Sequence, residues 1–323
     1  MTRRRSIALG VLLVLLGLWV YDRGLSTVQP GDSAWVRSTA DDSLQIVVDG
    51  VTLRVLDVGQ GTPLLLLHGW SDSTYTWHQL IPRLQDRYRL VAFDWPGFGY
   101  SDKPAGGMGY EDLVGVCDGV LDGLGIGRAI VVGNSMGGGA AVRFAADRPQ
   151  RTLGLVAIDA AAAVGQGQGP WLQSILTTPG VGHAAVWVMG RLTHRVSLTT
   201  AVADGDSVTD AIVEEMYLPL NTPNGRTAML EQFIEIKQNP VTRSVAARVR
   251  VPTLVLWGRE DSWIPLSTGE TLRDVIPGAR LEVLDHVGHL PQWEAPEVAA
   301  RLIDGFVRSV EAGATPAEPS PRH

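Results

Sequence analysis

Cysteine is nearly absent from this sequence, since Cys117 is the only one in 323 residues. One thiol cannot form a disulfide within the chain, so a scaffold held together by internal disulfides is excluded. Cys117 lies in the segment 111–124, whose leucines and valines recur at helical spacing. We therefore expect a buried cysteine that packs as a small apolar side chain, and not a catalytic nucleophile.

Positive charge is also in short supply. Lys and Arg number 27 against 34 Asp and Glu, which leaves a net charge of −7. Proteins that bind nucleic acid usually present a basic face, so we expect no nucleic-acid partner. The sequence also has no internal repeat. Its length and its 45% hydrophobic residues suffice for one large core domain that carries an insertion.

The N-terminus carries an apolar run behind Arg3, Arg4 and Arg5. The run Ile7–Tyr21 is shorter than the roughly 17–25 residues of a spanning helix, but flanking arginines can extend a short span. Because the cleavage signal at 24–26 is weak, residues 1–25 are expected to be an uncleaved membrane anchor, with a cleaved signal and secretion as the alternative. The arginines would keep the N-terminus cytoplasmic and place the catalytic domain on the non-cytoplasmic side.

Two further segments are expected to lie outside the folded core. Residues 26–43 are rich in Gly, Ser, Thr and Asp, which is typical of a linker. Residues 312–323 contain three prolines and little that is apolar, so this tail is expected to be disordered.

Short apolar runs alternate with helical patterns along most of the chain. The runs 44–48 and 51–55, joined by Asp49-Gly50, predict a hairpin. Further strands are predicted at 64–67, 90–93, 130–132, 153–158, 253–256 and 281–284. Helices are predicted at 76–84, 111–124, 136–147, 266–275 and 296–310. This alternation predicts an α/β fold with a mostly parallel sheet, built from residues 44–159 and 248–311.

The alternation stops between residues 160 and 247. This stretch holds Trp171, Trp187 and Met189, and turn residues break it at 178–180 and 222–225. We interpret it as a mostly helical cap inserted into the core. The three apolar side chains could line an apolar pocket, although packing inside the cap explains most of them.

One glycine-rich segment has the pattern of a nucleophile turn. It reads Gly133-Asn134-Ser135-Met136-Gly137, directly after a predicted strand and directly before a predicted helix. A sharp turn between strand and helix exposes a serine hydroxyl above the sheet, and glycines on both sides permit the turn. A phosphate-binding loop would need a lysine, which this segment lacks. Ser135 is therefore the predicted nucleophile.

A serine nucleophile needs a base, and His289 is the candidate. It lies in the loop after the predicted strand 281–284, where α/β folds place reactive groups. His286 is the rival in the same loop, expected to be structural or exposed. The remaining candidates are assigned to other places: His183 and His194 to the surface or the cap, and His78 to an exposed or capping position.

The third member should be an acid that orients the imidazole. Asp261 follows the predicted strand 253–256, which gives the chain order Ser, Asp, His. Neighbouring Glu260 stays open as an alternative, and so does Asp159 at the end of the strand 153–158.

Two backbone N–H groups are predicted to stabilise the oxyanion that forms at the attacked carbonyl. The first belongs to Met136, the residue after the nucleophile. The second belongs to Trp70, in the turn His68-Gly69-Trp70 that follows the strand 64–67. His68 is expected to stabilise that turn, because the base should follow the acid in this chain order.

Over about residues 44–310, the sequence resembles the α/β-hydrolase superfamily. The resemblance rests on five co-linear motifs: His68-Gly69-Trp70, the segment 94–101, the segment 133–138, the Asp261 turn and Gly288-His289. It implies a cap over the active site and neither metal nor cofactor. Ser135 excludes the dehalogenase and epoxide-hydrolase branches, which place Asp at the nucleophile position.

Within the superfamily, the segments 133–138 and 292–294 are similar to those of carbon–carbon hydrolases that act on aromatic ring-cleavage products. Those enzymes usually have a small glycine-rich turn after the first His-Gly, where this chain has Trp70. We therefore expect an esterase or lipase-like enzyme that acts through an acyl-enzyme on a small, apolar ester.

Three alternatives to ester hydrolysis remain. Carbon–carbon bond hydrolysis of ring-cleavage products would use the same three residues, and so would acyl transfer or perhydrolysis with a different acceptor. A catalytically silent scaffold of the same fold is the non-enzyme alternative, which the survival of Ser135, Asp261 and His289 disfavours.

Overall fold

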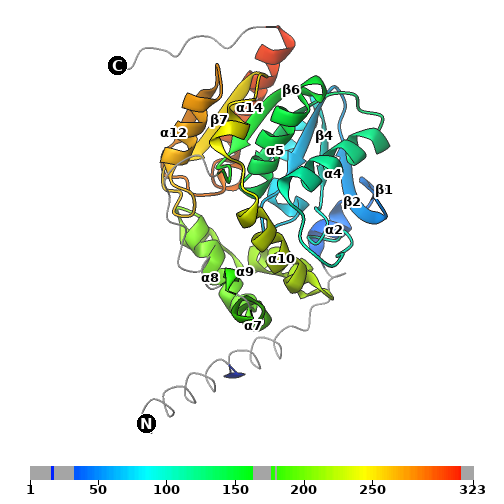
Figure 1. Cartoon of the computed structure of the whole chain (residues 1–323), viewed down its shortest axis with the longest axis vertical. Helices are drawn as coiled ribbons and strands as arrows, with labels where there is room; N and C mark the ends of the chain where they lie inside the picture. Colours follow the sequence, from blue (N-terminus) through cyan, green and yellow to red (C-terminus); the bar gives the residue numbers. More distant parts are fainter. Residues whose placement is uncertain (1–15, 18–32, 163–175, 179, 314–323) are drawn as a thin grey trace.

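The computed structural model describes residues 16–17, 33–162, 176–178 and 180–313, and its centre is one eight-stranded sheet (Figure 1). The strands are β1 (Ser43–Val48), β2 (Val51–Val58), β3 (Thr62–Leu67), β4 (Tyr88–Phe93), β5 (Ala129–Asn134), β6 (Thr152–Ile158), β7 (Thr253–Gly258) and β8 (Arg280–Leu284). Their spatial order is β1-β2-β4-β3-β5-β6-β7-β8. Strands β1 and β2 run antiparallel to their neighbours and all later pairs are parallel. The predicted α/β fold with a mostly parallel sheet is confirmed.

The central strands are continuous apolar runs because both faces of the sheet are covered. Leu64 and Leu66 of β3 pack on one side with α3 (Ile81–Leu84) and α14 (Pro296–Glu311). Leu65 and Leu67 point the other way and pack with α4 (Tyr110–Gly123) and α5 (Met136–Asp147). Successive side chains of a strand face opposite sides, so each of the buried positions 64–67 needs an apolar residue.

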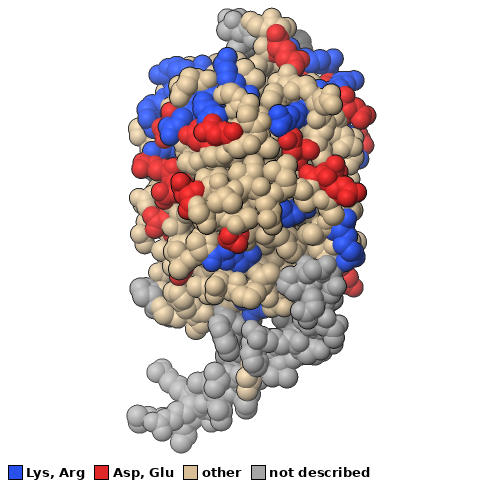
Figure 2. Space-filling model, turned by 90° about the vertical axis from the view of Figure 1, so that its right-hand side faces the viewer, with Lys and Arg blue, Asp and Glu red and all other residues tan. Residues whose placement is uncertain are grey.

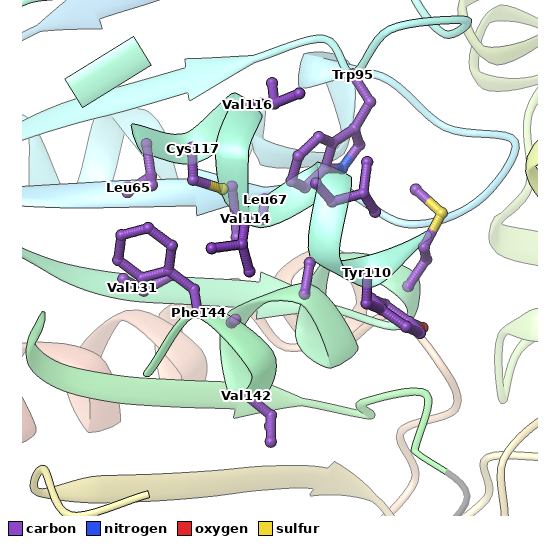
Figure 3. Packing of buried hydrophobic residues seen from close by; sticks show 14 of the residues in the cluster. Leu65, Leu67, Trp95, Tyr110, Val114, Val116, Cys117, Val131, Val142 and Phe144 are labelled. Carbon is purple, nitrogen blue, oxygen red and sulfur yellow. The ribbon is translucent and has the colours of Figure 1, made fainter. Parts of the chain in front are cut away.

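Figure 3 shows the second of these layers, where Leu65 and Val131 of the sheet lie close to Phe144 of α5 and Cys117 of α4. Cys117 is fully buried, as the sequence predicts. Burial raises the pKa of its thiol well above the ordinary value, which keeps it protonated and unreactive.

The predicted helix 76–84 is wrong in its extent. The structure has a 3-10 turn, η2 (Thr74–Trp77), followed by the short helix α3. Ser73 accepts a hydrogen bond from the Tyr75 N–H and begins the 3-10 turn early, and Pro82 stands in the first turn of α3. A proline there favours a new helix start, so the pattern breaks in two.

Between β6 and β7 the chain forms helices that lie at the carboxyl end of the sheet (Figure 1). They are α7 (Val181–Val188), α8 (Arg191–Ala201), α9 (Asp210–Tyr217), α10 (Gly225–Gln238) and α11 (Arg243–Ala246). All of them fall inside the segment predicted as a helical cap. Residues 163–175 of that segment, which include Trp171, lie outside the described part of the structure, and so does the side chain of Trp187.

The predicted linker 26–43 contains a helix, α2 (Ala34–Ser38). Ser33 caps its first turn and also donates to Glu215 of α9 at 2.6 Å, while the ring N–H of Trp35 donates to Thr74 at 3.3 Å. This short helix therefore ties the cap to the core, which a solvated linker would not do.

The membrane-anchored localisation predicted from the sequence requires correction. In the ranges that the structure describes, every helix is too short or too polar to cross a bilayer. Residues 1–15 and 18–32, which hold most of the predicted anchor, lie outside those ranges, as do residues 314–323 of the predicted tail.

Acidic and basic side chains are interspersed on the face shown in Figure 2. Many charged side chains of the described residues form ion pairs, as Arg148 does with Asp118 at 2.6 Å.

Candidate active site

Ser135 stands at the turn between β5 and α5. Its backbone has φ 54° and ψ −119°, a strained conformation for a residue other than glycine. Its N–H donates to the Ile158 carbonyl at 3.0 Å, which fixes the turn against β6. A side chain at Gly137 would overlap the Leu67 carbonyl oxygen, so the turn can form only with glycine at this position. This is the geometry that the sequence predicts for a nucleophile turn.

Asp261 and His289 meet at the same end of the sheet. His289 Nδ1 lies 2.7 Å from Asp261 Oδ2, and both side chains are buried. The other carboxylate oxygen of Asp261 accepts the N–H groups of Trp263 at 2.7 Å and Ile264 at 3.0 Å. Burial alone would raise the pKa of Asp261, but the charge and hydrogen bond of His289 and the Ile264 N–H hold it below its ordinary value. Asp261 is therefore an ionised acceptor that orients the imidazole.

The backbone around His289 is held from both the core and the cap. Its N–H donates to the Ala201 carbonyl of α8 at 2.7 Å, and its carbonyl accepts from the Asn134 side chain at 3.1 Å. Within the described part of the chain, Nε2 of His289 is buried and has no hydrogen-bond partner. That nitrogen is free to take a proton from a hydroxyl, and His289 lines the same cavity as Ser135.

The cavity has a volume of about 430 Å³, counted with the space at its open mouth. The core contributes Ser135, His289 and Trp70 to its wall, and the cap contributes His194 and Met216. No Lys or Arg belongs to the described lining, and the sequence of residues 163–175 contains none either. A negatively charged substrate group would therefore find no full cation in this wall.

The backbone segments predicted to form the oxyanion hole flank the nucleophile. Gly69 lies so close that a Cβ built on it would be 3.2 Å from the Cβ of Ser135. Met136 is the first residue of α5, so its N–H has no acceptor within the helix. The indole of Trp70 turns away to the cap, where it donates to the Met229 carbonyl at 2.7 Å. This leaves the backbone of 69–70 beside Ser135.

The rival residues occupy other positions. His286 is exposed, and Glu260 accepts the Val287 N–H at 3.1 Å and lies 4.0 Å from His286. His68 is buried between the Gly69 carbonyl at 2.8 Å and the Trp95 N–H at 3.0 Å, which stabilises the turn after β3. Burial lowers the pKa of His68 to about 4, so it is a neutral structural residue.

Two ionisable residues, Asp72 and His194, line the cavity although the sequence analysis did not place them there. Asp72 is buried, and burial raises its pKa to about 7 although the Ser73 N–H donates to it at 2.7 Å. His194 is 4% exposed, and burial lowers its pKa to about 4. The sequence does carry a signal for His194, because residues 194, 197, 198 and 201 share one helix face and all line the cavity. Asp72 carries only the weaker signal of following the end of β3.

Among the described residues, one group of three side chains beside Ser135 could offer ligand atoms to a metal ion. Asp159, Asp261 and His289 each offer one ligand atom, and these atoms lie within 4.8 Å of one another in the described structure. The 2.7 Å contact between His289 and Asp261 already satisfies both atoms as a hydrogen bond. The arrangement of these side chains is therefore explained by a histidine ring that a carboxylate orients through a hydrogen bond.

Known proteins share this architecture. A family model described as the alpha/beta hydrolase fold matches residues 62–296. A 2-hydroxy-6-oxononadienedioate/2-hydroxy-6-oxononatrienedioate hydrolase from Burkholderia vietnamiensis is 34% identical over 287 residues, which cover 84% of this chain and 96% of the relative. A meta-cleavage product hydrolase from Pseudomonas fluorescens IP01 superposes with a TM-score of 0.74 at 27% identity, covering 84% of this chain and 99% of that one.

A third similarity concerns the fold alone. The crystal structure of a bacterial membrane phospholipase A superposes with a TM-score of 0.73 and covers 96% of this chain and 99% of that one. The two sequences are only 22% identical, so this similarity says nothing about a shared substrate.

Proposed function

Because this chain belongs to the α/β-hydrolase fold family and is a hydrolase, we propose that Ser135 attacks a ketone carbonyl and that the carbon–carbon bond beside it is hydrolysed. The relative at 34% identity is named as a hydrolase of 2-hydroxy-6-oxononadienedioate, a compound with a ketone carbonyl and no ester, and it aligns over nearly its whole length. This corrects the order of the expectations from the sequence, which put ester hydrolysis first. The observation that carries the shared chemistry is the buried 2.7 Å contact between Asp261 and His289, in one cavity with Ser135.

The proposed reaction has two steps. The hydroxyl oxygen of Ser135 adds to the ketone carbon while His289 Nε2 takes the hydroxyl proton. The backbone N–H groups of Trp70 and Met136 stabilise the oxyanion that forms. The bond to the neighbouring carbon breaks, and that carbon leaves with the electron pair and receives the proton from His289. Water activated by His289 then attacks the acyl-serine and releases a carboxylic acid and the free hydroxyl.

Ester hydrolysis is the second candidate, and one observation favours it. The relative acts on a dienedioate, a dianion at neutral pH. The cavity wall here offers Asp72 and an imidazole of low pKa, and no Lys or Arg among its described residues. A buried carboxylate without a cation or several N–H donors is costly, whereas an uncharged ester needs neither.

Steady-state kinetics on two substrates test the proposal. We expect purified protein to hydrolyse 2-hydroxy-6-oxononadienedioate with a higher kcat/KM than p-nitrophenyl butyrate, and the reverse order would establish the ester candidate. Ser135→Ala should lower kcat/KM by at least about 10⁴-fold for whichever substrate is cleaved, because it removes the attacking atom. Full turnover by Ser135→Ala would refute both candidates, and so would a failure of the wild type on both substrates.

A further inference from the structure

A second buried carboxyl group stands beside the proposed triad. Asp159 directly follows β6, has φ 41° and is completely buried. Its N–H donates to the Leu256 carbonyl at 3.0 Å, and its Oδ1 accepts the Gly258 N–H at 3.0 Å. The end of β6 is thus fixed to the end of β7, and the side chain reaches toward the turn that holds Asp261.

Among the described residues, no cation stands beside Asp159 to stabilise a second negative charge. One oxygen of Asp159, one of Asp261 and one ring nitrogen of His289 lie within 4.8 Å of one another. Oδ2 of Asp159 is buried and receives no hydrogen bond from any described residue. The ionisable groups that act on Asp159 are Asp261 and Glu294, both acidic, and the nearby His289 belongs to Asp261.

Two carboxylates at this separation in a buried site cannot both be ionised, so one of them holds a proton. Asp261 accepts three hydrogen bonds, from His289, Trp263 and Ile264, whereas Asp159 accepts one. The negative charge is therefore better stabilised on Asp261. Burial first, and the charge of Asp261 second, raise the pKa of Asp159 well above its ordinary value.

We propose that Asp159 is a positioning residue, which holds a proton at neutral pH, donates it in a hydrogen bond to Asp261 and replaces Asp261 as the partner of His289 when that carboxylate is removed. This inference rests on the proposed triad. Both roles of Asp159 follow from its place beside Asp261 and His289. A protonated neighbour fixes the Asp261 carboxylate, and once residue 261 is neutral, the proton can leave and the Asp159 carboxylate can accept from His289 Nδ1.

A double-mutant cycle separates this role from a structural one. The variants are Asp261→Asn, Asp159→Asn and the double variant, assayed for kcat/KM on the better of the two substrates named above. We expect Asp159→Asn alone to cost less than about tenfold, because an amide can still donate to Asp261. In the Asp261→Asn background the same change should cost about 100-fold or more, because the last carboxylate is lost. An equal factor in both backgrounds would overturn the proposal.

The pH profile of Asp261→Asn gives a second measurement that leaves Asp159 intact. On the acidic side of the profile, the residual activity should fall at a different pH from that of the wild type, because a different carboxyl group must ionise to hold His289. An unchanged limb would contradict the proposal even if Asp159→Asn did not fold. Asp274→Asn, which removes an exposed carboxylate of α12 (Leu266–Val275), is the matched control and should behave as wild type. Activity in Ser135→Ala would instead mean that the proposed function itself fails.

Discussion

At the scale of single residues, Asp72 is the carboxyl group of the cavity wall that the triad does not use. Burial raises its pKa from 3.8 to about 7, so the folded protein binds a proton there that the unfolded chain releases at lower pH. A group of this kind stabilises the fold below the pKa of the unfolded chain, and the contribution is lost as the pH rises to the folded pKa. Stability should therefore fall between about pH 4 and pH 7 on account of Asp72.

Asp72→Asn should abolish this loss. The amide has the same shape, and its oxygen can still accept the Ser73 N–H. Between pH 5 and pH 8, the free energy of unfolding of the variant should gain about 3 kcal/mol relative to wild type, since one proton changes the stability by about 1.4 kcal/mol per pH unit. Urea denaturation at the two pH values measures the difference.

Asp49→Asn is the matched control for this measurement. Asp49 is exposed in the turn between β1 and β2, with φ 48°, which Asn also adopts readily. Its difference from wild type should stay the same at both pH values. A constant difference for Asp72→Asn as well would show that Asp72 is ionised throughout and that its burial has no such effect.

How far a residue could be predicted depended on how local its signal is. Ser135 is marked by glycines within two positions, and the loop that holds His289 follows a strand directly. The sequence left Asp159, Glu260 and Asp261 open, since each stands in a turn after β6 or β7. The structure separates them by contacts between distant segments, because only Asp261 is hydrogen-bonded to His289.

At the scale of secondary-structure elements, the turn from β5 into α5 depends on close contact between backbones. A Cβ at Gly137 would overlap the carbonyl oxygens of Leu67, at the end of β3, and of His68, which accepts the Trp95 indole N–H at 3.0 Å. Gly137→Ala should therefore lower the free energy of unfolding by about 3 kcal/mol and displace Ser135, so activity should fall as well. Thermal unfolding and the kinetic assay measure the two effects.

Gly115→Ala offers a control with the same chemical change. Gly115 lies inside α4, and a Cβ there meets nothing within 4 Å. Alanine is the better helix former, so this variant should be more stable by about 0.5–1 kcal/mol and fully active. If both substitutions had the same small effect, the close approach at Gly137 would not be what requires a glycine.

The elements that could be predicted are those with a continuous pattern. Buried strands such as β3, β5 and β7 each contain a continuous apolar run, and α14 repeats its apolar residues at helical spacing. The failures lie where capping or a distant contact decides the structure. A serine cap and a proline divide the predicted helix 76–84, and α2 is held by Glu215, which lies 181 residues further along the chain.

At the scale of the whole molecule, the proposed catalytic residues come together because parallel strands end at one edge. Ser135, Asp261 and His289 follow β5, β7 and β8, and the cap closes over that edge. The cap also supports the site directly, since Ala201 of α8 accepts the N–H of His289 and Met229 of α10 accepts the Trp70 indole. The sequence predicts the cap as an insertion, but which cap residues face the cavity follows only from how its helices pack.

The identity of the residue that a fluorophosphonate modifies tests the central claim most directly. Such a probe phosphonylates a serine hydroxyl, with loss of fluoride, when a base activates that serine. Peptide mass spectrometry of the inactivated full-length protein should find one adduct per chain, on Ser135. An adduct on another residue, or an inactivated protein with Ser135 unmodified, would contradict the account.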